Sequence, residues 1–111
     1  MFISGITDII CAAIRKQLLV TLRYGDDKLD RSFHPYHLYV ASTDNTLVSG
    51  LQVSNPNKPA GNGIYHTFNV HLIRSIALTG QSFSPRPDLA AIPQNYKRLI
   101  CSIAARGRER A

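Results

Sequence analysis

The alternation of side chains in residues 18–24 constrains the fold more than any other stretch of the sequence. Leu18, Val20, Leu22 and Tyr24 fall on one side of an extended chain, and the residues between them fall on the other. A period of two is typical of a half-buried β-strand, because successive side chains of a strand point to opposite faces of the sheet. Gly-Asp-Asp-Lys follows at 25–28 and predicts a turn. We therefore expect an antiparallel sheet that begins here.

A helix is expected before this strand. Its apolar residues recur at the i, i+3, i+4, i+7 spacing that makes one stripe along a helix: Ile6, Ile9, Ile10, Ala13 and Ile14. Ser4 is a suitable N-cap, and Arg15 and Lys16 lie near the end of the helix where cations are favoured. The pattern predicts a helix from about Ser4 to Gln17.

Four more strands are expected from similar patterns, at residues 30–41, 46–53, 64–70 and 75–79, with a short helical turn at 71–74. Pro35 cannot donate to a ladder, so the second strand should be bent or edge-exposed there, whereas Gly50 suggests a bulge or sharp bend in the third. Residues 54–63 form a long loop, which is either a binding lid or a tolerated surface insertion.

One helix followed by five short antiparallel strands indicates a mainly β (α+β) fold, a small closed barrel of the Sm or SH3 type. Phe83 would plug the end of the barrel. Pro93 would begin a C-terminal helix, since proline is favoured at the first helical position. Its apolar face would consist of Tyr96, Leu99, Ile100 and Ile103. We thus divide the chain into residues 1–84, the barrel, and 85–111, a linker, helix and basic tail.

The formal charge of +6 is concentrated in the C-terminal part. From Leu89 onward, five basic residues face a single acidic one, Glu109: Lys97, Arg98, Arg106, Arg108 and Arg110. This basic tail is either a phosphate-binding or partner-binding arm, or a solvated end that keeps the protein soluble.

Cys11 and Cys101 lie in apolar, helix-like contexts without a CxxC motif, which predicts buried thiols in a reducing compartment. No segment is long enough to span a membrane, and the apolar N-terminus carries Asp8 and lacks a basic start, so it does not read as a signal peptide. A cytoplasmic location is expected.

Neither an enzyme nor a cofactor site is expected. The sequence contains no nucleophile elbow and no GxxxxGK phosphate loop. Four histidines, His34, His37, His66 and His71, invite a metal site. However, His34 and His37 should lie on opposite faces unless Pro35 twists the strand, and no cysteine or glutamate lies at ligand spacing, so no metal is expected.

The order of several short motifs resembles the WYL domain family. They are Ala13-Ile14 at a helix end, Leu22-Arg23-Tyr24, Arg31-Ser32-Phe33-His34-Pro35, the run Phe68 to Ile73, and the closing Phe83. The resemblance covers about residues 6–84, and residues 87–104 are similar to the C-terminal extension of small stand-alone bacterial and phage members. It implies an Sm-like fold and a regulator that binds a nucleotide or nucleic acid. Such domains often lie beside a helix-turn-helix, and many are tied to phage defence.

The sequence departs from that family at its pocket. The tripeptide that names the family falls at Thr46-Leu47-Val48, without either aromatic residue. His66 stands where a basic residue is usual, and Leu72 replaces an arginine, with Arg74 displaced by two. The resemblance therefore implies a stacking and phosphate pocket that is weaker here or built differently.

Two functions follow as expectations. The first is a non-enzymatic domain that binds a nucleotide or single-stranded RNA or DNA, with these residues at its site: Arg31, His34, Tyr36, His66, Arg74, Arg15 and Arg23. Arg31 is the best single candidate, although it could instead pair with a carboxylate such as Asp30. Tyr24 and Phe68 fall on apolar faces and are expected in the core. The second function is a protein-interaction or homo-oligomeric assembly module that uses an open strand edge.

Overall fold

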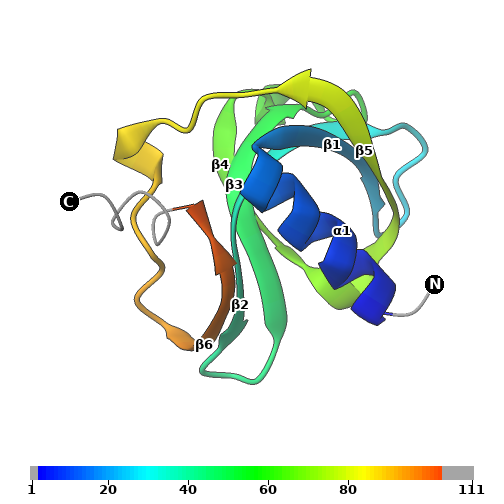
Figure 1. The fold of residues 1–111 in the computed structure, drawn as a ribbon. Helices are drawn as coiled ribbons and strands as arrows, with labels where there is room; N and C mark the ends of the chain where they lie inside the picture. Colours follow the sequence, from blue (N-terminus) through cyan, green and yellow to red (C-terminus); the bar gives the residue numbers. More distant parts are fainter. Residues whose placement is uncertain (1–2, 104–111) are drawn as a thin grey trace.

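The structure, a computed structural model, describes residues 3–103 and consists of one helix and a six-stranded antiparallel sheet (Figure 1). The elements are α1 Ile3–Lys16, β1 Leu18–Tyr24, β2 Arg31–Ala41, β3 Thr46–Ser54, β4 Ile64–Asn69, β5 Ile73–Ser82 and β6 Tyr96–Ser102. Three 3-10 turns join them at Pro59–Gly61, Val70–Leu72 and Pro87–Leu89. The strands pair in the order β4-β3-β2-β1-β5, and β6 pairs with β2.

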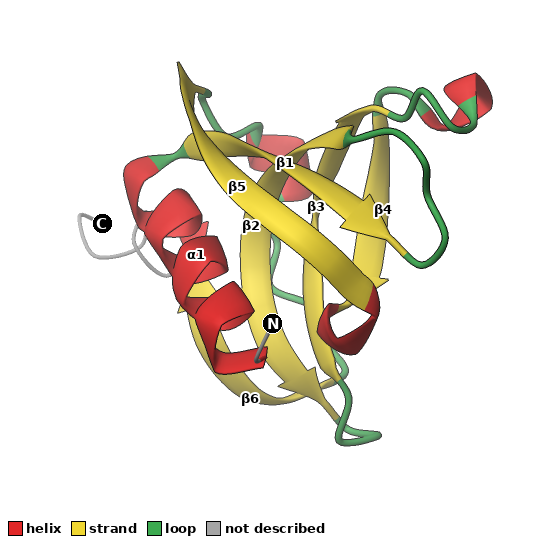
Figure 2. Cartoon of the chain, turned by 90° about the vertical axis from the view of Figure 1, so that its right-hand side faces the viewer, coloured by secondary structure: helices red, strands yellow, loops and turns green. Residues whose placement is uncertain are grey.

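Helix α1 confirms the predicted amphipathic helix. It begins at Ile3, so Ser4 lies within the helix and does not precede it as an N-cap. Its apolar stripe packs against residues of the strands, and Figure 2 shows the helix lying against the sheet. Ile6, Ile10 and Ile14 are almost wholly buried there, in one cluster with residues of the strands. Burial of this stripe, and not helix propensity, stabilises a helix of this length.

Strand β2 changes its partner at Pro35. Residues 31–33 pair with β1, whereas residues 37–41 pair with β6. Pro35 has no N–H to donate, so it suits the point where one partner is exchanged for another. Opposite it, the pairing with β3 shifts register between Pro35↔Gly50 and His37↔Ser49, which inserts one extra residue into β2. The predicted bend at Pro35 and irregularity at Gly50 are confirmed.

The predicted closed barrel is wrong. Strands β4 and β5 stand at opposite ends of the strand path, and the described sheet is not closed between them. The 3-10 turn Val70–Leu72 connects these two end strands directly. The Asn69 side chain accepts a hydrogen bond from the backbone N–H of His71 and so fixes this turn, close to the helical turn expected at 71–74. The two end strands are therefore joined by the chain through this turn, and not by backbone pairing between them.

The predicted C-terminal helix is also wrong, because residues 96–102 form strand β6. It pairs with β2 from His37↔Ser102 to Ala41↔Tyr96. The second half of β2 has left β1, so its backbone groups on that side need new partners. β6 supplies them. Pro93 therefore lies in the connecting segment before a strand, and the described part of the basic tail, Lys97 and Arg98, lies on that strand.

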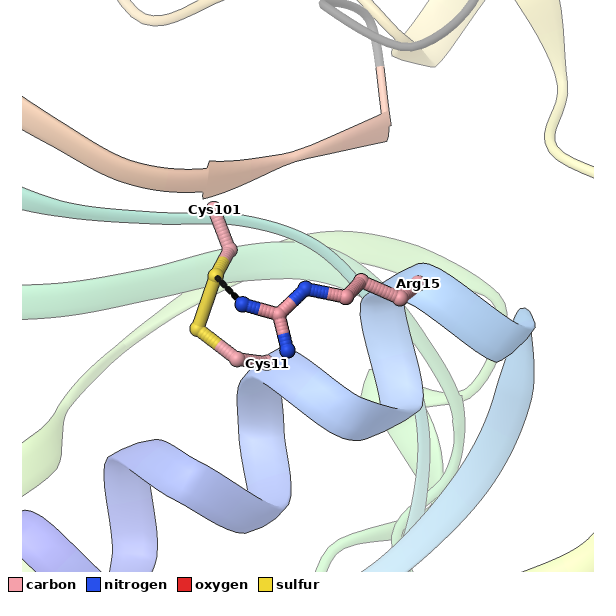
Figure 3. The surroundings of a disulfide bond; sticks show 3 residues. All are labelled: Cys11, Arg15 and Cys101. Atoms are coloured by element: carbon pink, nitrogen blue, oxygen red, sulfur yellow. Dashed lines mark hydrogen bonds between the residues drawn. A yellow bond between two sulfur atoms is a disulfide. The ribbon is translucent and has the colours of Figure 1, made fainter.

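Cys11 and Cys101 form a disulfide that joins α1 to β6 across 90 residues of sequence (Figure 3). Their Cα atoms are 5.7 Å apart, and the guanidinium Nη2 of Arg15 lies 3.8 Å from the Cys101 sulfur. The prediction of two free thiols is wrong, since the folded sheet brings β6 beside α1. The expected reducing compartment loses the observation on which it rested. No described helix is both long and apolar enough to cross a membrane.

Gly50 should be irreplaceable, because a Cβ at this position would lie 2.0 Å from the backbone oxygen of His34. Gly50→Ala is expected to lower the free energy of unfolding by about 3 kcal/mol, as overpacking of a closed site does. Gly80→Ala is the matched control, since nothing lies within 4 Å of its added methyl group. Urea denaturation of both variants measures the difference. Equal midpoints for the two would contradict the close approach of β2 and β3.

The disulfide should contribute strongly to stability because it closes a long loop. Reduction, or the double change Cys11→Ser and Cys101→Ser, is expected to lower the free energy of unfolding by about 2–4 kcal/mol. Denaturation of the wild type with and without dithiothreitol measures this contribution. If the reductant lowers the stability of the double variant as much as that of the wild type, the effect does not come from this bond.

Candidate functional site

A cavity of about 300 Å³ opens where the first half of β2 meets β1, β3 and β4. We call it the Arg31 pocket. It is lined by Tyr24, Arg31, Gln52, Asn55, Lys58, Gly61, Ile64 and His66. Its strand residues come from four different strands, and its loop residues come from the connection between β3 and β4.

The connection between β3 and β4 is a fixed wall of this pocket. The side-chain oxygen of Asn57 accepts the N–H groups of Lys28 and Leu29 at 3.1 and 3.0 Å, and its amide donates to the Leu29 carbonyl at 2.9 Å. The backbone N–H of Asn55 donates to the side chain of Asn62 at 2.7 Å. Asparagine side chains thus hold residues 55–62 against the turn between β1 and β2. The sequence predicts this segment as either a binding lid or a surface insertion.

Arg31 forms the floor of the pocket. Its Nε and Nη2 atoms donate to the two carboxylate oxygens of Asp27 at 2.6 and 3.0 Å, and Nη1 donates to the Gln52 side chain at 3.0 Å. The guanidinium carbon lies 5.5 and 5.4 Å from the ring centres of Tyr24 and Phe68. The Arg31 and Asp27 side chains are only 13% and 7% exposed. These two rings also contact each other, with centres 4.8 Å apart, so the guanidinium lies beside both of them. The bidentate pair with Asp27 leaves the guanidinium plane little freedom.

The carboxylate partner of Arg31 is Asp27 and not Asp30, which pairs with Arg23 at 2.8 Å. The Arg31 hydrogen bonds lower the pKa of Asp27, against the opposing effect of burial. Arg74 also donates to the Asp27 backbone oxygen and helps to lower this pKa. Because Asp27 cancels the charge of Arg31, the net positive charge around the pocket comes from Arg74 and Lys58.

His66 supplies an uncharged polar group. Its ring lies 4.5 Å from that of Phe68, centre to centre. Burial, and then the nearby positive charge of Arg31, lowers the pKa of His66. The imidazole is therefore neutral at pH 7 and can both donate and accept a hydrogen bond at the pocket.

The structure brings Arg31 and His66 together, with Arg74 joined to them through Asp27, but it separates other predicted site residues. The His34 ring stacks on Phe83 with centres 4.1 Å apart, and the Phe83 ring is buried in the core, although there is no closed barrel for it to plug. Tyr36 is fully buried, and its hydroxyl accepts the backbone N–H of Arg86 at 2.9 Å. Neither residue lines the Arg31 pocket.

The remaining predicted basic residues lie elsewhere. Arg15 is beside the disulfide, and Arg23 is paired with Asp30. Lys97 pairs with Asp44 on an exposed surface, and Arg98 is exposed on β6. Arg106, Arg108 and Arg110 lie outside the described residues. Over residues 3–103, no three His, Cys, Asp or Glu side chains gather closely enough to hold a metal ion.

Sequence reasoning missed four polar residues of this site: Asp27, Gln52, Asn55 and Lys58. Asp27 is interpreted from sequence as a turn former, although its position four residues before Arg31 brings the two side chains together once the turn closes. Gln52 interrupts the apolar pattern of β3, and this interruption was the available signal in the sequence. Its side chain is 2% exposed, and a buried amide needs a hydrogen-bond partner. Asn55 and Lys58 belong to the loop between β3 and β4, whose conformation cannot be predicted from the spacing of apolar and polar residues.

Removal of the Asp27 charge should destabilise the fold, because it would leave Arg31 buried without its counter-ion. Asp27→Asn is expected to lower the free energy of unfolding by about 3 kcal/mol at pH 7. Asp30→Asn, which breaks an exposed pair, should cost about 0.5 kcal/mol. Urea denaturation compares the two.

The same pair predicts a pH dependence. Since the folded-state pKa of Asp27 is lowered, its stabilisation is complete above the ordinary carboxyl pKa of about 4 and is lost as the pH falls through the folded-state value. Asp27→Asn should therefore have a shallower loss of stability below about pH 4 than the wild type. Parallel curves for the two would contradict the pairing.

Comparison with known proteins shows the fold and no more. Neither a protein-family model nor a curated protein matches the sequence. A solved structure, that of the proteasome accessory factor B/C (PafBC) of Arthrobacter aurescens, is similar, with a TM-score of 0.59 and 19% sequence identity. The match covers 77% of this chain but only 13% of PafBC. The chain thus shares the fold of a small part of a much longer protein.

Proposed function

We propose that this chain is a WYL-like, non-enzymatic ligand-binding domain of a regulator, which recognises a nucleotide or single-stranded nucleic acid at the Arg31 pocket. The observation that carries the proposal is a cavity in which Asp27 and Gln52 fix an arginine beside two aromatic rings, with Lys58 in the lining and Arg74 bonded to the backbone of Asp27. The order of WYL-like motifs and the fold shared with part of PafBC support it.

The polar groups of the pocket divide into two kinds. Lys58 in the lining, and Arg74 outside the lining on the Asp27 backbone, are cations that can approach phosphate oxygens. Asp27 and Gln52 use three of the five guanidinium N–H groups of Arg31, which leaves two for a ligand. His66 offers a neutral donor and acceptor suited to a base edge or a ribose hydroxyl. A volume of about 300 Å³ suits a single nucleotide unit.

The proposal predicts salt-dependent binding that depends on Lys58. Fluorescence anisotropy with labelled single-stranded RNA, and with DNA of the same sequence, should give an affinity that falls as salt rises. Lys58→Ala should weaken it severalfold and reduce the slope of log affinity against log salt by about 0.7, the loss of one phosphate contact. His66→Gln should weaken binding without changing the slope, because its ring carries no charge.

Two controls locate the site. Lys16→Ala removes the same charge at the exposed end of α1, outside the pocket, and should leave the affinity unchanged. A chain that ends at residue 104 tests the tail arginines separately. Full binding by Lys58→Ala, together with lost binding by the shortened chain, would assign recognition to the tail and refute the pocket.

The second candidate, a homo-oligomeric or protein-interaction module, is favoured by the two ends of the sheet. β4 and β5 are the two end strands of the strand path, and they carry exposed apolar side chains at Ile64, Tyr65 and Leu78. Open edges of this kind can pair with another chain. Light scattering tests this function. A mass equal to that of the monomer at high concentration, with no protein partner recovered from cells, would count against it.

A further inference from the structure

A second and larger cavity, of about 570 Å³, lies on the opposite face of the sheet from the core. Its floor comes from β2, β3 and β4 through Tyr39, Leu47, Ser49, Tyr65 and Thr67. Along these strands the neighbours Leu38, Val48 and Phe68 point into the core, so the floor residues point outward. The other wall is residues 88–95 of the segment between β5 and β6, which leaves the sheet and returns to it in Figure 1.

The floor is a connected row of hydroxyl groups. The Tyr39 hydroxyl lies 3.1 Å from the Ser49 hydroxyl, which lies 2.9 Å from that of Thr67. Tyr39 and Ser49 are 3% and 1% exposed, so this polar row is built into the sheet and not spread over its surface. Burial raises the pKa of Tyr65, with a hydrogen bond between the side chains of Ser49 and Tyr65 acting in the opposite direction. The floor is therefore uncharged and can both donate and accept hydrogen bonds.

The segment over the floor is fixed at both ends. The backbone N–H of Arg86 donates to the Tyr36 hydroxyl at 2.9 Å, and the Asn95 carbonyl accepts the N–H of Ser42 at 2.8 Å. Leu89 and Ala90 pack against the core between these points. Because both ends are anchored, the cavity is preformed.

His37 is a buried polar residue beside this segment. Its side chain is fully buried on the same side of β2 as Tyr39, and its Nδ1 lies 2.8 Å from the Ser102 hydroxyl. Burial lowers the pKa of His37, and hydrogen bonds to the backbone of Ala90 and Ala91 act in the opposite direction, which places the ring next to the cavity wall at Ala91.

The charge of this cavity differs from that of the Arg31 pocket. No lysine, arginine or histidine lines it, and its one ionised side chain, Asp88, is paired with Arg86 at 2.8 Å. Apolar walls from Leu47, Leu89, Ile92 and Pro93 alternate with the hydroxyl row and with the amides of Gln94 and Asn95. Apolar walls with a few hydrogen-bonding groups suit an apolar ring that carries donors and acceptors on its edge.

We propose that this cavity is a binding site for a small, uncharged heteroaromatic molecule, held by the hydroxyl row on one edge and by residues 88–95 over its face. A charged ligand would lose its hydration without gaining a counter-ion there. The site is separate from the Arg31 pocket and does not depend on the function proposed for that pocket.

The experiment is a titration of the ¹⁵N-labelled full chain with adenine and with benzimidazole at pH 7.5, where both are neutral. Backbone amide shifts are expected at residues 49, 65, 67, 88–92, 94 and 95, and not at the Arg31 pocket residues 52, 55, 58 and 61. Benzoate and benzamidinium, rings of similar size that carry opposite charges, should bind at least tenfold more weakly. No shifts up to millimolar concentration, or equal binding of the charged rings, would overturn the proposal.

Two variants test the assignment without relying on a single fold-sensitive change. Thr67→Val keeps the shape of an exposed side chain but removes its hydroxyl, and should weaken binding about three- to tenfold. Ala91→Trp, at an exposed position of the wall, should fill the cavity and abolish binding. Lys58→Ala should leave this binding unchanged. Unaltered affinity in Ala91→Trp with a native spectrum would place the ligand elsewhere.

Discussion

The contact between Pro35 and Gly50 is the constraint on which the rest of the sheet depends. At this point β2 has one extra residue relative to β3, and the pairing of β2 passes from β1 to β6. An extra residue reverses the alternation of side chains beyond it. Phe33 before the bulge and Leu38 after it can therefore both face the core, although an odd number separates them. Gly50 permits this because its backbone lies against His34.

The same irregularity separates the two cavities. Arg31, before the bulge, lies on the core side and forms the floor of a pocket at the end of the sheet. His37 and Tyr39, after the bulge, lie on the outer side beneath residues 88–95. Without the change of partner at Pro35, the second half of β2 would have no free edge for β6. The segment before β6 would then have no fixed end from which to cover the outer face.

The elements that could be predicted from sequence are those determined by local periodicity. The apolar stripe of α1 and the alternation in β1 each specify one buried face. Pro35 and Gly50 mark the irregularities of β2 and β3 by their residue type alone. Residues 96–103 could not be assigned in this way, because Tyr96, Leu99, Ile100 and Ile103 match a helical stripe. The free edge of β2 decides that this segment is a strand, and the disulfide between Cys11 and Cys101 depends on the same placement. Both are consequences of the tertiary fold.

The candidate site was predictable only in part, for a related reason. A sequence motif identifies Arg31. Only the closed turn decides that both carboxylate oxygens of Asp27 bind Arg31, while Asp30 pairs with Arg23. That choice changes the role of Arg31. A paired guanidinium adds little net charge, so Arg31 acts as a fixed donor, and attraction of an anion depends on Lys58 and Arg74. The outer cavity lacks such cations altogether, so the two faces of one sheet differ in the charge of the ligand that each can accept.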